Sequence, residues 1–308
     1  MMSPERDHLD YTANKRYGVG KSYGTFGELL QGVLPNEQNF LVTFPIEKYS
    51  ECKYYPSVTG DLSITPQGKL KSLDLARKLL SYYDKPVSGH LVIDSELVQG
   101  KGLASSTADM IAVSRAIEDV FGMEIPVGVV ESFIRDIEPT DGIMHAGIVV
   151  YYHKKLELRE SLGSCPPLSI LALDEGGEID TIKYNQVERE VSQVDKTEYQ
   201  SLLSDMSSAL RHHDLKLLGR VTTRSAILNQ KNRPKKTLDS MREICDSIGG
   251  VGVVTAHSGT YIGIILSDDD PDYTTKREIG LESLRQLGYP VEVFNSCSSH
   301  YVKKEVPV

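Results

Sequence analysis

The segment from residue 98 to residue 108, VQGKGLASSTA, constrains this chain more than any other. A strand-like run at 88–97 precedes it, and an amphipathic helical pattern at 107–121 follows it. Gly100 and Gly102 let backbone N–H groups come close to an anion, and the start of a helix adds unpaired N–H donors and the positive end of its dipole. The segment therefore predicts a strand, loop and helix unit that binds a phosphate-like anion.

The side chains of this loop have candidate roles of their own. Lys101 can lie over phosphate groups as a point charge. Ser105, Ser106 and Thr107 supply hydroxyls, one to cap the helix and another to bind a magnesium ion that bridges nucleotide phosphates. A glycine turn before a Ser/Thr-capped helix has the same composition, and the loop taken alone favours that plainer interpretation. It is neither a Walker A sequence nor a dinucleotide fingerprint.

The amino-acid composition limits the kinds of molecule that this chain is expected to bind. The chain has 308 residues, of which 40% are hydrophobic and 25% charged, which suits one large or two ordinary globular domains. Its formal net charge of −9 opposes binding to nucleic acid or to anionic lipid. The four cysteines lack metal-ligand spacing, and neither a signal peptide nor a run of about 20 apolar residues is found. We expect a cytoplasmic protein, monomeric or homodimeric, without nucleic-acid or membrane partners.

Periodicity along the chain predicts an α+β protein. Helical patterns cover 73–83, 107–121, 197–210, 214–229, 235–247 and 275–287, with Gly122 as a C-cap of the second. Strand patterns cover 39–46, 88–97, 168–173, 251–256, 261–267 and 290–294. At 154–160 the sequence becomes rich in charged residues, and Gly163 and two prolines follow. We place a domain boundary there and expect domains at 1–160 and 161–308.

Three more segments accompany the loop in order along the chain. They are GELLQG at 27–32, EPTD at 138–141 and AHSG at 256–259. Together with KGLASSTAD at 101–109, they resemble the GHMP kinases, which are named for galactokinase, homoserine kinase, mevalonate kinase and phosphomevalonate kinase. Within that superfamily the chain is most similar to the L-threonine kinases of cobalamin synthesis and propanediol utilisation. The likeness covers residues 20–265, and four collinear motifs are far more specific than any one alone.

The resemblance implies a fold and an activity. The fold would be the two-domain α+β GHMP kinase fold, with a ribosomal-protein-like N-terminal domain and a ferredoxin-like C-terminal domain. The active site would lie between the two domains. The cofactors would be ATP and Mg²⁺, and the acceptor a small hydroxyl-bearing metabolite, first of all L-threonine, which would become O-phospho-L-threonine.

The resemblance also assigns catalytic and nucleotide-binding roles. The ATP-binding residues would be Gly100, Lys101, Gly102, Leu103, Ala104, Ser105, Ser106 and Thr107. Asp141 would act on the acceptor proton, as base or as orienting group, with Lys101 as a second catalytic residue. Ser106 would bind the metal together with Glu138 or with Glu131, which stands ten residues before Asp141. The choice between the two glutamates stays open.

Acceptor binding would fall to Glu28, Thr25, His257, Ser258 and Gly259. Each candidate has a plainer alternative. Glu28 can simply pin a glycine-framed turn, His257 can be a structural histidine, Glu131 can lie on a solvated helix face, and Asp141 can be ordinary turn chemistry. Arg224 can meet a carboxylate or phosphate, although a surface helix arginine is its default interpretation.

Departures from the family pattern concern the acceptor more than the phosphates. Ser22 and Phe26 occupy a segment in which those threonine kinases have cysteines, and Gly142 replaces a serine after the motif aspartate. Val98 and Ala104 differ from the broader superfamily loop, and Ala104 agrees with the threonine-kinase subgroup. The acceptor could therefore be another amino alcohol, hydroxy acid or hydroxy amino acid. A catalytically silent ATP-binding sensor is the alternative from another functional class.

Overall fold

The structure is a computed structural model that describes residues 16–177, 191–256 and 259–297. The strands are β1 (Gly18–Val33), β2 (Asn39–Pro56), β3 (Leu62–Thr65), β4 (Gly89–Ser95), β5 (Ile148–Tyr152), β6 (Glu157–Gly163), β7 (Leu168–Asp174), β8 (Gly252–Thr255), β9 (Tyr261–Ser267) and β10 (Val291–Asn295). The helices are α1 (Leu70–Tyr82), α2 (Ser105–Phe121), α3 (Val127–Arg135), α5 (Gln193–Arg211), α6 (Leu215–Asn229), α7 (Leu238–Ile248) and α8 (Tyr273–Arg285). In this described part, no helix combines the length and the hydropathy needed to cross a membrane.

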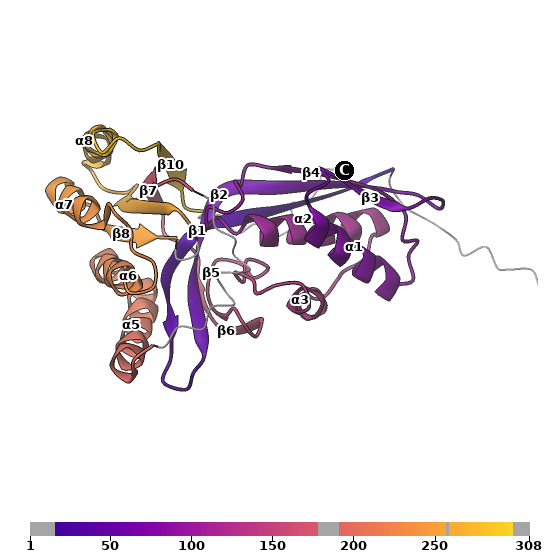
Figure 1. Cartoon of the computed structure of the whole chain (residues 1–308), viewed down its shortest axis with the longest axis horizontal. Coiled ribbons are helices and arrows are strands. Elements are labelled where there is room, and N and C mark those ends of the chain that lie inside the picture. The colour runs from indigo at the N-terminus through magenta and orange to yellow at the C-terminus, as the bar shows by residue number, and fades with distance from the viewer. Residues whose placement is uncertain (1–15, 178–190, 257–258, 298–308) are drawn as a thin grey trace, which may run out of the picture.

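The long strand β1 joins two groups of elements into one mixed sheet. The strand order is β10-β7-β9-β8-β1-β2-β4-β3, and β5 and β6 branch from β2. Only β3 and β4 pair in parallel among the described strands. Figure 1 shows α1, α2 and α3 near one half of the sheet and α5 to α8 near the other. Glu28 of β1 pairs with Thr255 of β8, so the two halves meet at this residue.

Glycines allow β1 to lie directly on α2. A Cβ atom at Gly20 would lie 2.0 Å from the Ala112 carbonyl oxygen, and one at Gly18 would lie 2.2 Å from the Ala116 carbonyl oxygen. Both helix residues are alanines that are fully buried. Small residues on both elements therefore bring the two backbones into contact and fix the height of α2 above the sheet.

Most of the predicted elements are confirmed within a few residues at their ends, although β2 continues to Pro56, ten residues beyond the strand predicted at 39–46. The structure contains the helices expected at 73–83 and 107–121, and Gly122 ends α2 in the left-handed conformation with φ 61°. The sequence pattern did not indicate β1, β3, β5 or β6 as strands. The turn expected around Glu28 is a bulge inside β1, where Gly27 has φ 50°. The domain boundary expected after residue 160 falls within β6, and the division into two domains stays a prediction.

Replacement of Gly20 by alanine should destabilise the fold. The new methyl group would collide with α2 backbone atoms, which cannot move aside as a flexible side chain would. We expect a loss of roughly 1–3 kcal/mol in the free energy of unfolding, as for other overpacked cores. Chemical denaturation measures the loss. Gly128→Ala is the matched control, because no atom lies within 4 Å of its added Cβ; equal stability of the two variants would contradict the packing argument.

Candidate active site

The segment at 98–108, which we call the phosphate loop, leads into α2 through three residues with left-handed backbone. They are Gly100 (φ 71°), Gly102 (φ 81°) and Ala104 (φ 56°). Ala104 is the N-cap residue and its side chain offers no cap, so the serine or threonine cap that the sequence suggested is not formed. The first-turn N–H groups have no partner earlier in the helix and point out of its N-terminus. This is the arrangement that binds anions at helix starts.

β1 and the segment after β8 hold this loop in place. Thr25 N donates to the Leu103 carbonyl at 3.2 Å, and Gly27 N donates to the Gly102 carbonyl at 2.9 Å. On the other side, Gly259 packs so closely that an added Cβ would lie 1.9 Å from the Lys101 carbonyl oxygen. Backbone contacts from two distant parts of the chain therefore fix the position of the loop.

Three carboxylates surround the loop. A cavity of about 80 Å³ is lined by Glu28, by residues of the phosphate loop, and by Glu138 and Asp141. The Ser106 hydroxyl donates to Glu138 Oε1, and Lys71 Nζ forms an ion pair with Glu138 Oε2. These contacts bring the EPTD motif against the start of α2, as the sequence predicted for residues 98–108 and 138–141.

Asp141 is the titratable group that its surroundings disturb most clearly in this cavity. Burial raises its pKa, and the negative charges of Glu28 and Glu138 raise it further, to about 7. A hydrogen bond with Thr107 acts in the opposite direction, and the Thr107 hydroxyl itself accepts a hydrogen bond from Thr140 at 2.7 Å. A carboxyl group with a pKa in this range suits the role of a general base at neutral pH.

The contact between Ser106 and Glu138 suits a magnesium ion. Mg²⁺ prefers oxygen ligands and commonly uses one or two protein groups, with water and phosphate oxygens completing its shell. A hydroxyl and a carboxylate oxygen meet here beside the helix start. The described residues contain no cluster of three or more His, Cys, Asp or Glu side chains that could form an all-protein metal site. The donor set fits a metal that arrives with a nucleotide.

Two residues expected in the site point elsewhere. Lys101 Nζ does not lie over the loop, because it donates to Asp174 Oδ2 at 2.7 Å and to the Gly177 carbonyl at 2.8 Å. Although burial opposes it, the hydrogen bonds from Lys101 and Thr260 hold the pKa of Asp174 below its ordinary value. Glu131 accepts hydrogen bonds from the Tyr151 hydroxyl and from His145 and does not line the cavity. Of the two candidate metal ligands, the structure brings Glu138 to the loop.

The residues predicted to bind the acceptor lie in different places in the structure. Glu28 is buried and lines the cavity, whereas Thr25 is buried in β1 and supports the loop through its backbone. Gly259 contacts the phosphate loop itself. His257 and Ser258 lie outside the described residues. Arg224 forms a two-bond contact with Glu198 of α5, at 2.5 and 3.0 Å, so it has the surface-helix role that was its default interpretation.

Two lysines at the site were not indicated by the sequence. Lys71, in the first turn of α1, holds Glu138 through its ammonium group. Lys235, between α6 and α7, is buried and donates to the Gly259 carbonyl at 2.6 Å. Neither stands in a motif, and each reaches its partner across a long sequence separation, so no local pattern indicates them.

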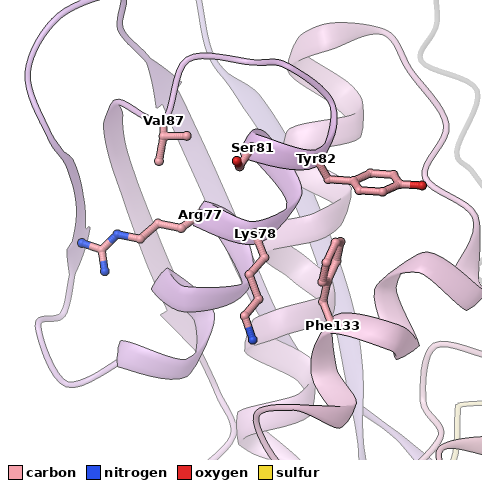
Figure 2. A pocket seen from close by; sticks show the side chains of 6 residues that line it. All are labelled: Arg77, Lys78, Ser81, Tyr82, Val87 and Phe133. Carbon is pink, nitrogen blue, oxygen red and sulfur yellow. The ribbon is translucent and has the colours of Figure 1, made fainter.

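A larger hollow of about 550 Å³ lies elsewhere, between α1 and α3 (Figure 2). Its lining residues are Arg77, Lys78, Ser81, Tyr82, Val87 and Phe133, none of which lines the phosphate-loop cavity. This lining is basic and apolar and contains no carboxylate, histidine or cysteine that could accept a proton from a hydroxyl. We therefore place the candidate active site at the smaller cavity.

Comparisons with known proteins show which proteins this chain resembles. Residues 71–151 match the family model of the GHMP kinases N terminal domain. The chain is 29% identical over 263 residues to an L-threonine kinase from Citrobacter freundii, covering 83% of this chain and 89% of that protein. It is 25% identical over 268 residues to an L-threonine kinase from Salmonella typhimurium, covering 85% and 87% respectively.

Solved structures show the same fold. The homoserine kinase from Cytophaga hutchinsonii superposes with a TM-score of 0.74 at 13% identity, covering 94% of this chain and 97% of that one. The mevalonate kinase from L. major, solved with R-mevalonate, gives 0.67 at 16% identity, covering 93% and 96%. This chain is therefore similar to the GHMP kinases in its matched N-terminal segment and in its fold, and its two relatives named above are small-molecule kinases.

Proposed function

We propose that this kinase transfers the γ-phosphoryl group of ATP to the hydroxyl of L-threonine and so produces O-phospho-L-threonine. The observation that carries the proposal is the position of Asp141, which faces a preformed, amide-lined helix start across one small cavity. The L-threonine kinases named above supply the choice of acceptor, and the buried carboxylate of Glu28 at the same cavity suits the ammonium group of an amino acid.

The residues of the cavity divide the work of phosphoryl transfer. The first-turn N–H groups of α2 hold phosphate oxygens, and Ser106 and Glu138 would hold magnesium, which neutralises negative charge on the phosphates when bound. Lys71 keeps the Glu138 carboxylate oriented from the other side. The acceptor hydroxyl gives its proton to Asp141 while its oxygen bonds to the γ-phosphorus and the bond from that phosphorus to ADP breaks.

Alignment supplies much of the rate in this kind of reaction. The loop is fixed by β1, and the EPTD segment is tied to α2 through Glu138 and Thr140, so both reacting partners meet on rigid supports. Little chemistry beyond positioning, charge neutralisation and one proton transfer is required of the protein.

A panel of acceptors tests the proposed substrate. We expect L-threonine to have a kcat/KM at least about tenfold above that of L-serine, L-homoserine and 1-amino-2-propanol, because one well-placed methyl or charged group discriminates by such factors. ADP release in a coupled assay measures it. A different best acceptor would replace L-threonine in the proposal, and ATP binding without turnover of any acceptor would favour the silent sensor.

Asp141→Asn tests the general base. The amide keeps the shape of the side chain but cannot take a proton, so kcat should fall by about 10²- to 10⁴-fold. The dissociation constant of a non-hydrolysable ATP analogue should change by less than about threefold, because the loop itself is untouched. Asp136→Asn is the matched control at an exposed position on the same segment. Full activity of Asp141→Asn would remove this residue from the mechanism.

The raised pKa of Asp141 predicts opposite effects of pH on activity and stability. Only the ionised carboxylate can act as a base, so kcat/KM should rise with pH through an apparent pKa of about 7. Between its ordinary pKa of 3.8 and about 7, the folded protein holds a proton that the unfolded chain has lost, so Asp141 contributes less stability as pH rises through this range.

Asp141→Asn should consequently raise the melting temperature at pH 8 by a few degrees and have a smaller effect at pH 5. Differential scanning calorimetry at the two pH values measures this difference, with Asp136→Asn again as the control. A lower melting temperature at pH 8 would show that the ionised carboxylate is stabilised by its surroundings, contrary to its burial beside Glu28 and Glu138.

A further inference from the structure

Lys235 is a buried ammonium group that forms no ion pair within the part of the chain that the structure describes. Its Nζ donates to the Gly259 carbonyl at 2.6 Å. Burial lowers its pKa to about 8, with Arg233 acting in the same direction and Glu175, Asp174 and Glu28 opposing it. An ammonium group carries three N–H donors, and one neutral carbonyl accepts only one of them.

Several polar atoms near the ends of α6 and β8 also lack partners. Within the described residues, Asn229 Nδ2, Gln230 Nε2, Thr255 Oγ1 and Gln31 Oε1 are buried and have no hydrogen-bond partner in the protein. Asn229 is 3% exposed and Thr255 is 1% exposed. Buried polar atoms in folded proteins almost always have hydrogen-bond partners. A group of buried atoms without such partners therefore indicates a place where a ligand or water binds. Three of these four atoms can donate a hydrogen bond.

The packing of α6 beside β8 places Asn229 and Thr255 at the same height along these two elements. Helix α6 and strand β8 run side by side in the same direction, since Gly219 contacts Gly252 and Thr223 Oγ1 accepts from Val253 N. Two further strand residues advance about 7 Å, the same as four to five helix residues, which brings Thr255 to the last turn of α6, where Asn229 lies.

Lys235 and Gln230 belong to the same place. Gln230 Oε1 accepts a hydrogen bond from Lys235 N at 2.9 Å, which also fixes the orientation of the Gln230 amide. Lys235 in turn reaches Gly259, the glycine packed on the phosphate loop. We call Asn229, Gln230, Lys235 and Thr255 the donor recess.

The donor recess adjoins the active-site cavity through Glu28. This residue pairs in register with Thr255 on the neighbouring strand, and it lines the cavity together with Asp141. The negative charge of Glu28 also acts to raise the pKa of Lys235. A positive, donor-rich cluster of buried groups and the carboxylate of Glu28 are therefore neighbours, and Glu28 lines the same cavity as Asp141.

We propose that the donor recess binds the α-carboxylate of an amino-acid acceptor while Glu28 receives its ammonium group. This inference rests on the proposed function and makes the acceptor a zwitterion in place of a simple alcohol or amino alcohol. A carboxylate only accepts hydrogen bonds, up to about four, and so matches a surface of donors. Lys235 and the partnerless amide and hydroxyl donors supply the bonds, and the cation supplies the charge.

Lys235→Met tests the inference by separating the carboxylate from the rest of the acceptor. Equilibrium binding of L-threonine and of 1-amino-2-propanol, which lacks the carboxylate, is measured by calorimetry with a non-hydrolysable ATP analogue present. We expect the dissociation constant of L-threonine to rise by about 30-fold, as for loss of a charge-assisted hydrogen bond, and that of 1-amino-2-propanol to change by less than about threefold. Lys236→Met, at an exposed neighbouring position, should leave both constants unchanged.

The other results would overturn the inference. Equal weakening of both acceptors would assign Lys235 to holding the Gly259 segment in place, and weaker binding of the ATP analogue would assign the donors to a nucleotide phosphate. An unchanged affinity for L-threonine would leave the recess to water. Because binding is measured without turnover, a protein that binds L-threonine through Lys235 but never phosphorylates it would contradict the proposed function and not this inference.

Discussion

The site depends on backbone hydrogen bonds between β1 and the phosphate loop. Gly27 and Thr25 donate to the carbonyls of Gly102 and Leu103, and the bulge that aims these donors also carries Glu28. Gly27 has a left-handed backbone, and a Cβ there would strike the backbone of Ala256. One irregular stretch of β1 therefore positions three features: the proposed phosphate-binding loop, the Glu28 carboxylate and the junction with β8.

Charge in the cavity is arranged for ligands and not for stability. Glu28, Glu138 and Asp141 lie around one small space, and their mutual repulsion contributes to the raised pKa of Asp141. Lys71 compensates Glu138 in part. A bound metal ion and the ammonium group of an acceptor would neutralise the remaining negative charge of the three carboxylates. The charges in the cavity would then balance only when these ligands are bound. Such stored repulsion is common where proteins place several ionisable groups for chemistry.

Local sequence features predicted the parts of the site that local rules govern. Gly100 and Gly102 have the left-handed backbone that a close approach to anions requires, and the helix after them begins at Ser105. The order of the motifs predicted the meeting of residues 98–108 with residues 138–141, because the resemblance to a known fold carries long-range information. Strand β1 was missed since its glycines, which serve contact with α2, weaken the usual strand pattern.

Long-range partners were beyond prediction from local patterns. The sequence left Glu131 and Glu138 as alternative metal ligands. In the fold, Tyr151 and His145 donate hydrogen bonds to Glu131. Ser106 and Lys71 donate hydrogen bonds to Glu138. Likewise Lys101 has the sequence context of a phosphate ligand, yet the nearby Asp174 attracts it. A lysine side chain is long enough to choose among several anions, so its partner follows from tertiary structure.

Two lysines connect the loop with the half of the fold that follows β7. Lys101 extends from the loop to Asp174, which also accepts a hydrogen bond from Thr260, and Lys235 extends to the Gly259 carbonyl. Between these links, Gly259 and Gly102 touch through their backbones. The proposed nucleotide side and the proposed acceptor side of the cavity thus share the backbone of Gly102 and Gly259 as a common wall. Because transfer rates fall steeply when reacting atoms are misplaced by about 1 Å, a common wall is the simplest way for this fold to keep hydroxyl and phosphate aligned.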